Sequence, residues 1–390
     1  MVEAARGEAG RARRPGSRAG PARILDRMGR RDRNRRMDYS RRTFIKSGVA
    51  AAAVAGSGVA MAAEPKKLAL GFDNFSIRAW GWKAPKLLEF AAAQKCDGVL
   101  FSDLDVYENH GEAHLKQVRE QAAALGLFVH AGTGSICPSS GAFRDKWGDA
   151  EAHLRVCLKV AKGLGTTVVR CYLGTGRDRK SEGGIRARIA DTVKALKAVR
   201  SEALDLGVKF GVENHAGDMQ AHELRDLIEE AGTDFVGATI DAGNAAWTLE
   251  DPVANLEVLA PYAVSGGIRD TMVWTTENGV KAQWAAIGEG NVDMALYFKR
   301  WGELCPEVPV VLEIISEYGK NIDWKRPEFW EVYPEARAAD FAQFLKLAES
   351  GKPKDGFQGK GKEAAQEFQM AELTRSIKTC RKEFGLGRTG

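Results

Sequence analysis

The octapeptide VKFGVENH, residues Val208 to His215, places three polar side chains directly behind a short apolar run. Apolar side chains at every second position, from Val208 to Val212, have the two-residue period of a strand. A carboxylate, an amide and an imidazole at the carboxyl end of a strand do not suit a packed core. They suit the mouth of a barrel, where active sites lie. If this stretch decides the fold, other strands should deliver matching groups to the same place.

The composition allows one large core. The chain has 390 residues, of which 44% are hydrophobic, and this length alone does not require two domains. Its formal net charge of +5 comes from the amino-terminal segment. Residues 1–46 contain 15 Lys and Arg against 5 Asp and Glu, a balance of +10, which leaves −5 for the remainder. A mildly acidic folded part does not indicate a nucleic-acid partner.

Residues 1–63 are expected to be a leader outside the fold. Ser40-Arg41-Arg42-Thr43-Phe44-Ile45-Lys46 resembles the twin-arginine export motif, and a run rich in Ala, Val and Gly follows from Gly48 to Ala63. The resemblance implies the twin-arginine translocase as a partner during export and a periplasmic or otherwise exported location. Ala60-Met61-Ala62 fits a small-x-small cleavage site, so cleavage is expected near Ala62.

Two alternatives for this leader stay open. The apolar run is shorter than the roughly 20 residues that span a membrane, so no stable span is expected, but an uncleaved anchor is the alternative. Met37 is a candidate start, in which case residues 1–36 are not translated. Otherwise residues 1–36 are a disordered extension.

Strand-like and helix-like runs alternate after Pro65. Strands are expected at residues 68–72, 98–101, 127–130, 167–173, 208–213, 236–241, 263–268 and 308–314. Helices are expected at residues 85–95, 112–125, 150–164, 185–206, 222–231, 252–260, 292–304 and 336–348. This alternation predicts an α/β fold, a (β/α)8 TIM barrel over residues 64–350. A doubly wound sheet is the alternative, but no GxGxxG follows the first strand.

The end of the chain, residues 351–390, is predicted to be an appendage of the barrel. Residues 351–362 (GKPKDGFQGKGK) have the composition of a flexible linker. Residues 364–384 then form a predicted helix, which we expect to pack against the barrel.

Four successive predicted strands are each followed by a carboxylate, namely Glu213, Asp241, Asp270 and Glu313. In a barrel these acids share one mouth, where like charges repel. A divalent cation held by hard oxygen ligands would relieve the repulsion. Protonation together with arginine pairing would also relieve it. The remaining alternative is that these four acids lie apart from one another in solvent-exposed loops.

The same strand ends carry five short motifs: Glu213-Asn214-His215, Asp241-Ala242-Gly243-Asn244, Ile268-Arg269-Asp270, Gly288-Glu289-Gly290-Asn291-Val292-Asp293 and Glu313. In order and spacing they resemble the xylose isomerase-like superfamily, the sugar phosphate isomerase/epimerase family. The resemblance covers about residues 67–350 and implies the same (β/α)8 barrel. Glu372–Gly385 resembles a carboxyl-terminal helix of that family.

This resemblance implies one bound divalent metal. Glu213, Asp241 and Glu313 match three of the family's four ligands, and three carboxylates favour Mn²⁺ or Mg²⁺ over Zn²⁺. Gly267 stands where the family has its histidine ligand, which puts the metal in question. The fourth ligand is left open among His215, His130, Asp270 and water.

The resemblance also implies catalytic roles. Glu213 and Glu313 match the two carboxylates that remove and return a proton next to a carbonyl. Arg269 is expected either to hold a substrate hydroxyl or to form an ion pair with Asp270 or Glu313. The expected substrate contacts are His215, Asn244, Arg269, Trp247 and His130.

The predicted function is a sugar isomerase or epimerase acting on a non-phosphorylated sugar or keto-sugar, because phosphorylated intermediates stay in the cytoplasm. The expected partner is a small carbohydrate, and a homo-oligomer is compatible with the sequence. Two alternatives remain. The first is a keto-sugar lyase or dehydratase of the same superfamily. The second is a non-catalytic periplasmic carbohydrate-binding barrel, favoured by the departures from the family's motifs at Gly267 and Asn244.

Overall fold

Eight parallel strands form one sheet in the computed structural model, which describes residues 67–388. Their order is β10-β1-β2-β3-β4-β5-β6-β7. The bounds are β1 Leu70–Asp73, β2 Gly98–Phe101, β3 Phe128–Ser135, β4 Val168–Tyr172, β5 Lys209–Glu213, β6 Val236–Ile240, β7 Ala263–Gly266 and β10 Val310–Leu312. Ile268 joins the two ends of the sheet, since its N–H donates to Val311 O (2.7 Å) and its carbonyl accepts from Glu313 N (3.0 Å).

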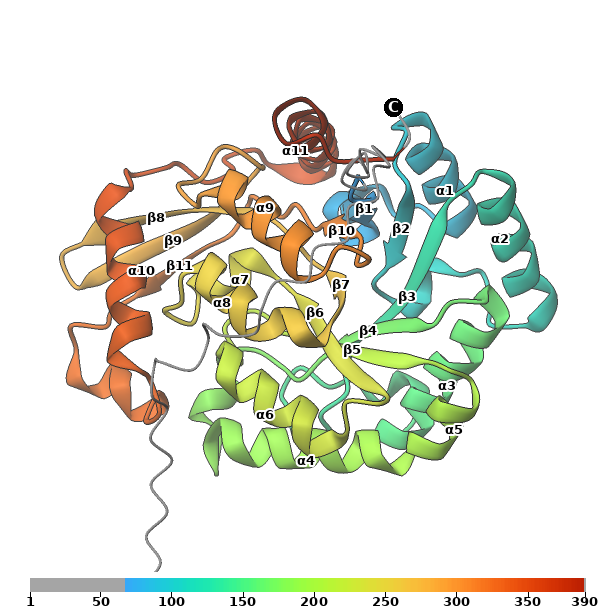
Figure 1. Ribbon diagram of the computed structural model, residues 1–390, viewed down its shortest axis with the longest axis horizontal. Coiled ribbons are helices and arrows are strands. Elements are labelled where there is room, and N and C mark those ends of the chain that lie inside the picture. Colours follow the sequence, from blue (N-terminus) through green and yellow to red (C-terminus); the bar gives the residue numbers. More distant parts are fainter. Residues whose placement is uncertain (1–66, 389–390) are drawn as a thin grey trace, which may run out of the picture. The chain divides into compact units, whose positions relative to one another are not determined.

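Helices connect the strands and cover the outside of this barrel (Figure 1). They are α1 Ala84–Ala93, α2 Glu112–Ala124, α3 Ala150–Leu164, α4 Gly184–Ala198, α5 Arg200–Asp205, α6 Ala221–Ala231, α7 Ala242–Ala246, α8 Pro252–Leu259, α9 Met294–Leu304 and α10 Ala338–Ser350. Short 3-10 turns are η1 Asn74–Trp80, η2 Leu104–Val106, η3 Asp145–Trp147, η4 Asp178–Lys180, η5 Ala260–Tyr262 and η6 Pro327–Val332. The predicted (β/α)8 barrel is thus confirmed. The helix predicted at residues 185–206 is two helices, α4 and α5, separated at Val199.

Local sequence signals explain where these helices begin and end. The Asp149 side chain accepts a hydrogen bond from Ala152 N at the start of α3, and Gly165 ends that helix with a φ of 69°. Gln220 and Glu223 form a capping box at the start of α6. Each helix runs back from the barrel mouth toward the amino ends of the strands, so the loops that follow the strands gather at one face.

A second, antiparallel sheet stands beside the mouth, at a place where the sequence predicts only a long loop. Within residues 67–388 it contains β8 Asp270–Thr276, β9 Gly279–Ala285 and β11 Gly319–Ile322. β8 and β9 form a hairpin in which Thr276 pairs with Gly279 across a two-residue turn. Figure 1 shows this sheet next to α10, on the opposite side from α1 and α2. It brings further aromatic and basic side chains to the mouth.

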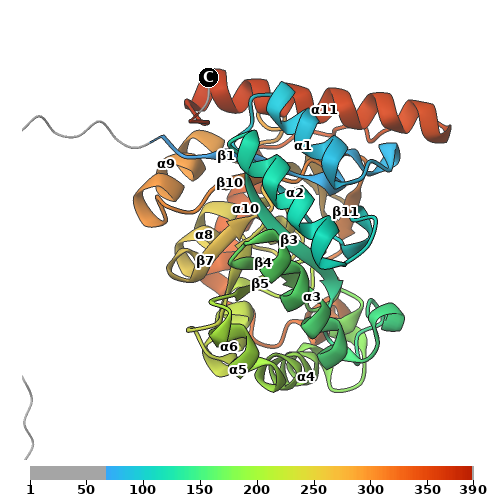
Figure 2. The same cartoon turned by 90° about the vertical axis from the view of Figure 1, so that its right-hand side faces the viewer.

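The carboxyl-terminal helix α11, Gly361–Phe384, packs on the barrel near α1 (Figure 2). Gln369 Oε1 accepts from Ala79 N (2.9 Å), and Trp80 Nε1 donates to Gln366 O (3.1 Å). Leu373 and Ile377 are buried in the same contact. No helix in residues 67–388 is long and apolar enough to cross a membrane. The twin-arginine leader predicted for residues 1–63 lies outside the described residues.

Candidate functional site

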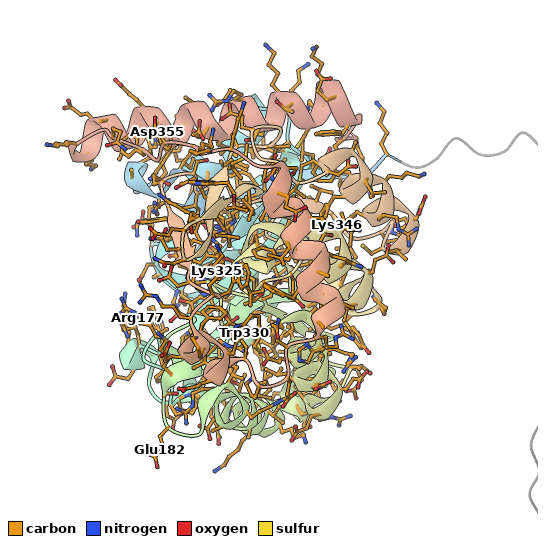
Figure 3. The ribbon with its side chains drawn as sticks, turned by 90° about the vertical axis from the view of Figure 1, so that its left-hand side faces the viewer. Arg177, Glu182, Lys325, Trp330, Lys346 and Asp355 are labelled. Carbon is orange, nitrogen blue, oxygen red and sulfur yellow. The ribbon has the colours of Figure 1, made fainter. Side chains whose placement is uncertain are left out.

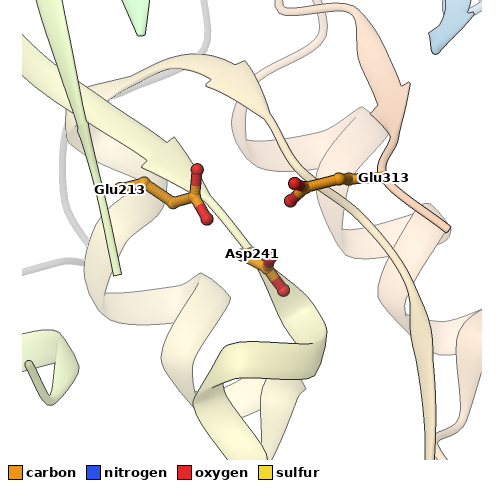
Figure 4. A group of neighbouring side chains, drawn as sticks. All are labelled: Glu213, Asp241 and Glu313. Atoms are coloured by element: carbon orange, nitrogen blue, oxygen red, sulfur yellow. The ribbon is translucent and has the colours of Figure 1, made fainter. Parts of the chain in front are cut away.

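Three buried carboxylates meet at the mouth of the barrel. Glu213 ends β5, Asp241 follows β6 and Glu313 follows β10, and their exposed fractions are 1%, 0% and 3%. One oxygen of each lies within 4.8 Å of an oxygen of the others. Figure 4 shows the three side chains pointing toward one another. In the part of the chain that the structure describes, this is the one such group of potential metal ligands.

Glu213 is held by two polar side chains. Arg170, on β4, donates from Nε to Glu213 Oε2 and from Nη1 to Thr133 O (3.2 Å). Asn244 Nδ2 donates to Glu213 Oε1 (3.1 Å) and to Asp241 Oδ2 (2.8 Å). Both oxygens of Glu213 are therefore directed by fixed donors, which gives its carboxylate a defined orientation.

The octapeptide's middle polar residue, Asn214, fixes the neighbouring strand end. Its Nδ2 donates to Asp241 O (2.8 Å), and its Oδ1 accepts from Asp241 N (2.9 Å). The Asp241 side chain in turn accepts from Asn244 N (2.9 Å) at the start of α7. A metal-binding role is not needed to explain Asn214, because it aligns the ends of β5 and β6.

Arg269 bridges the other two acids. Its Nη2 donates to both Asp241 Oδ2 and Glu313 Oε2, and its guanidinium carbon lies 4.3 Å from the ring centre of Trp284. Of the two ion pairs that the sequence leaves open, the pair with Glu313 is present. Asp270 instead accepts backbone hydrogen bonds from Thr271, Gly288 and Gly290.

A fourth acid, which the sequence analysis missed, lies behind the group. Asp73 ends β1 and is buried; its Oδ1 accepts from Ser102 Oγ (2.6 Å) and Phe75 N (2.7 Å). Its Oδ2 has no hydrogen-bond partner among the described residues. Burial, followed by the charge of Glu313, raises the pKa of Asp73 well above its ordinary value. Its place directly after the first apolar strand was the available signal.

The site holds more negative than positive charge. Fully ionised, the four carboxylates of Asp73, Glu213, Asp241 and Glu313 stand against the two guanidinium groups of Arg170 and Arg269. Burial also raises the pKa of Asp241 well above its ordinary value, although Arg269 opposes this. In spite of their burial, both arginines have a raised pKa because the surrounding carboxylates stabilise their charge. The net excess of two negative charges favours an added proton or cation.

The histidines do not join the carboxylate group. His215 Nδ1 donates to Gly174 O (2.7 Å), and its ring stacks on Tyr172 with centres 3.7 Å apart. Burial, followed by the charge of Arg170, lowers the pKa of His215 to about 3, so its ring is neutral and Nε2 is an acceptor. His130 Nδ1 is bonded to Ser265 Oγ (3.0 Å) inside the barrel. Neither is among the converging ligands, whereas His215 does line the site cavity.

A cavity of about 210 Å³ opens onto these acids. Four of the expected substrate contacts line it, namely His215, Asn244, Trp247 and Arg269, and His130 does not. Trp247 and Trp284 stack with ring centres 3.9 Å apart and form one wall. Phe75, on η1, also lines the cavity. Two further lining residues, Ile315 and Tyr318, were not predicted from the sequence.

The residues present fit a divalent cation. Three carboxylates from separate strands are the hard oxygen ligands that Mg²⁺ and Mn²⁺ take, and the excess negative charge is of the right sign. Asn244 Oδ1 is buried without a partner among the described residues. A Cβ at Gly267 would lie 3.5 Å from Glu313 Oε2 and 3.6 Å from Asp241 Oδ2, so the glycine leaves one side of the group open. A bound ion and Arg269 would compete for the same oxygens.

Solved structures with this fold share little sequence with the chain. A D-psicose 3-epimerase structure, in the presence of D-fructose, has a TM-score of 0.54 at 14% identity, over 80% of this chain and 98% of that one. A D-psicose 3-epimerase with D-tagatose, from Clostridium cellulolyticum H10, has a TM-score of 0.51 at 14% identity, over 78% and 99%. An L-ribulose 3-epimerase has a TM-score of 0.51 at 17% identity, over 82% and 97%. At these identities the likeness supports the fold alone.

No curated protein sequence matches the chain. A family model does match, over most of the barrel. It is the model of the xylose isomerase-like TIM barrel, and it matches residues 69–346, from the start of β1 into α10. Since this match covers well over half of the 390 residues, the chain belongs to the xylose isomerase-like TIM barrel family.

Proposed function

We propose that this protein is a sugar isomerase or epimerase that moves a proton on a carbon next to a carbonyl group. The observation that supports this most directly is the convergence of Glu213 and Glu313 from opposite sides of the mouth, with Asp241 between their strands (Figure 4). Proton removal and return need two groups that exchange protons at one carbon, and two carboxylates on different strands meet that need.

In the proposed reaction one glutamate takes the proton from the substrate carbon and the other returns a proton to it. Negative charge then develops on the substrate oxygen. Arg269 supports that charge, because it lines the cavity and its buried Nε and Nη1 have no hydrogen-bond partner among the described residues. Arg170 and Asn244 keep Glu213 in position. When bound by Glu213, Asp241 and Glu313, a divalent ion would supply Lewis acidity toward the substrate oxygens.

The proposed substrate is a non-phosphorylated sugar or keto-sugar. Aromatic rings pack on the C–H faces of sugars, and Trp247, Trp284 and Tyr318 line the cavity. His215 Nε2 and Asn244 Oδ1 add acceptors for sugar hydroxyl groups. The proposed export of the protein through the twin-arginine pathway also favours a substrate without phosphate.

Solvent exchange tests the proposal. The protein is incubated in D₂O with free ketoses and with 3-keto-glycosides, and deuterium on the carbon next to the carbonyl is followed by NMR. Label is expected with at least one substrate, and Glu213→Gln and Glu313→Gln should each lower its rate by roughly 10²–10⁴-fold. Glu257→Gln, which changes an exposed acid on α8 far from the mouth, is the matched control.

The products identify the reaction class. A labelled epimer or isomer supports the proposal, whereas a labelled unsaturated product indicates elimination. If the protein binds sugars but labels none of them, and Glu313→Gln leaves binding unchanged, the barrel is a binding protein and the proposal fails.

A further inference from the structure

A second and larger cavity lies beside the first. Its volume is about 1300 Å³, against about 210 Å³ for the cavity at the acids. Its walls come from the loops that follow β3 and β4, from β11 and from the segment that includes η6. All of these loops follow strands at the mouth of the barrel. Figure 3 shows two of its residues, Arg177 and Lys325, on the same face of the molecule.

The two cavities share a wall. Trp247 lines both of them, with Trp284 stacked on it from the side of the smaller one. Lys320, which lines the larger cavity, donates from Nζ to Trp247 O (3.1 Å). A molecule whose reacting part occupies the small cavity can therefore extend past Trp247 into the large one.

The larger cavity is strongly basic. Its lining contains seven Arg and Lys but three Asp and Glu, a balance of +4, on a chain whose residues 47–390 sum to −5. Two of the seven cations are paired, Arg179 with Glu223 and Arg326 with Asp323. The other five lie more than 4.0 Å from any carboxylate oxygen of residues 67–388; they are Arg144, Arg177, Lys180, Lys320 and Lys325. We term these five residues the basic cavity cations.

Two of the three acids of the lining have partners of their own. Asp178 accepts hydrogen bonds from Ser140 Oγ (3.0 Å) and from the backbone of Gly141 and Thr175. Asp323 pairs with Arg326, which leaves Glu328 as the acid of the lining without an ion pair in the described residues. Within residues 67–388, the basic cavity cations therefore have no carboxylate partner.

Lys320 lies close enough to other cations of the lining for their charges to affect its pKa. It is largely shielded from solvent, and the carbonyl of Trp247 is the hydrogen-bond partner of its ammonium group. Burial, followed by the charges of Arg179 and Lys180, lowers the pKa of Lys320 to about 8. A concave surface with one sign of charge concentrates oppositely charged ligands.

We propose that the substrate is an anionic saccharide larger than a monosaccharide, with its reacting sugar in the small cavity and its carboxylate- or sulfate-bearing remainder on the basic cavity cations. This inference rests on the proposed function for the identity of the reacting sugar. The requirement for negative charge comes from the larger cavity alone. The volume of that cavity exceeds the 300–1,000 Å³ typical of small-ligand pockets, which fits a chain of several sugar units.

Binding of defined oligosaccharides tests the proposal by calorimetry. The probes are hexagalacturonate, which carries carboxylates, a heparin hexasaccharide, which carries sulfates, and maltohexaose, which is neutral. One or both anionic probes should bind at least about tenfold more tightly than maltohexaose, equivalent to about 1.4 kcal/mol. The advantage should shrink at high salt, since exposed charges are screened. The two anionic probes separate a carboxylate from a sulfate preference.

Variants locate the binding site. Arg177→Gln combined with Lys325→Gln removes two exposed cations and should reduce the binding of the anionic probe by about tenfold or more, with maltohexaose unaffected. The matched control is Lys194→Gln combined with Lys197→Gln, which removes the same charge from exposed positions near the end of α4, at the far face of the barrel. That control should leave all three affinities unchanged.

Three results would overturn the inference: equal affinity for neutral and anionic probes, an equal loss in the control variant, or displacement of the probes by inorganic sulfate at similar concentration. They differ from failure of the proposed function, which is absence of deuterium exchange. If the protein exchanges deuterium into neutral sugars and shows no preference for anionic ones, the proposed reaction is supported and the anionic substrate is rejected. If the protein binds anionic probes selectively but exchanges no deuterium, the anionic ligand is supported and the proposed reaction is rejected.

Discussion

The stem of Arg269 crosses Gly243 so closely that a Cβ atom at position 243 would lie 2.3 Å from Arg269 Cγ. Trp284 closes the other side, with its Nε1 donating to Gly243 O (3.1 Å). The glycine therefore makes room for the arginine that bridges Asp241 and Glu313. Because Gly243 and Asn244 are consecutive, one short motif positions both Arg269 and Glu213.

A methyl group at this position should displace Arg269. Gly243→Ala is expected to lower the free energy of unfolding by about 1–3 kcal/mol, the usual cost of an overpacked core position. It should also slow the proposed proton exchange, because Arg269 moves away from both acids. Thermal unfolding and the rate of deuterium incorporation measure the two effects.

Gly267→Ala is the matched control. Its Cβ would meet Glu313 Oε2 at 3.5 Å and Asp241 Oδ2 at 3.6 Å, which are ordinary van der Waals distances. The variant should unfold at nearly the wild-type temperature. Equal destabilisation by the two substitutions would contradict the close packing of Arg269 on Gly243.

The barrel could be predicted because its signals are local and repeated. Each strand is a short apolar run, and each is followed by an amphipathic segment with recognisable caps, as in α3 with Asp149 and Gly165. The acids could be located for the same reason. Since parallel strands end at one face, Glu213, Asp241 and Glu313 had to meet.

The rest depends on contacts between distant segments. Asn278-Gly279 is a favoured hairpin pair in the sequence, but the two-residue turn between β8 and β9 is Glu277-Asn278. The third strand, β11, begins at Gly319, 34 residues after β9 ends at Ala285. Arg269 pairs with the acids of the mouth and not with Asp270 because Gly243 and Trp284 hold its side chain there. These two residues are distant from Arg269 in the sequence pattern, so the contact could not be predicted from spacing. The larger, basic cavity likewise assembles from five separate segments of the chain, each of them unremarkable in sequence.

Replacing Arg269 and replacing one of the acids should change the affinity for Mn²⁺ in opposite directions. Asp241→Asn removes a ligand and is expected to weaken Mn²⁺ binding by about tenfold or more. Arg269→Gln frees Asp241 Oδ2 and Glu313 Oε2 and removes a positive charge, so it should tighten Mn²⁺ binding by a similar factor. Calorimetric titration of chelator-treated protein measures both. Weaker binding in Arg269→Gln would show that the arginine supports the ion and does not compete with it.

The tryptophan wall should affect substrate binding more than turnover. Trp247→Leu removes one ring of the Trp247–Trp284 stack and is expected to raise KM about 3- to 10-fold with little change in kcat, because ring stacking is worth about 0.5–1.5 kcal/mol. Trp274→Leu is the control, since Trp274 lies on β8 and does not line the site cavity. A fall in kcat at constant KM would instead place Trp247 in the reaction step.

Glu250 should make the protein less stable as the pH rises. Its buried carboxylate accepts from Ala221 N (3.0 Å) at the start of α6 and from Asn255 Nδ2 (3.0 Å), yet burial raises its pKa from 4.5 to about 7. Between these values the folded protein keeps a proton that the unfolded chain releases, so the free energy of unfolding falls as pH rises. At roughly 1.4 kcal/mol per pKa unit, the fall is at most about 3.5 kcal/mol.

Glu250→Gln should remove this pH dependence while keeping the shape of the side chain. The stability of the wild type minus that of Glu250→Gln, measured by urea unfolding, is expected to fall steadily from pH 4.5 to pH 7 and to stay constant above it. Glu257→Gln is the control of opposite sign, because the hydrogen bond from Arg300 lowers the pKa of Glu257. The difference in the free energy of unfolding between the wild type and Glu257→Gln should disappear toward acid pH, as the pH falls below the pKa of Glu257 in the folded protein. A difference for Glu250 that grows with pH would mean that its hydrogen bonds stabilise the ionised form more than burial disfavours it.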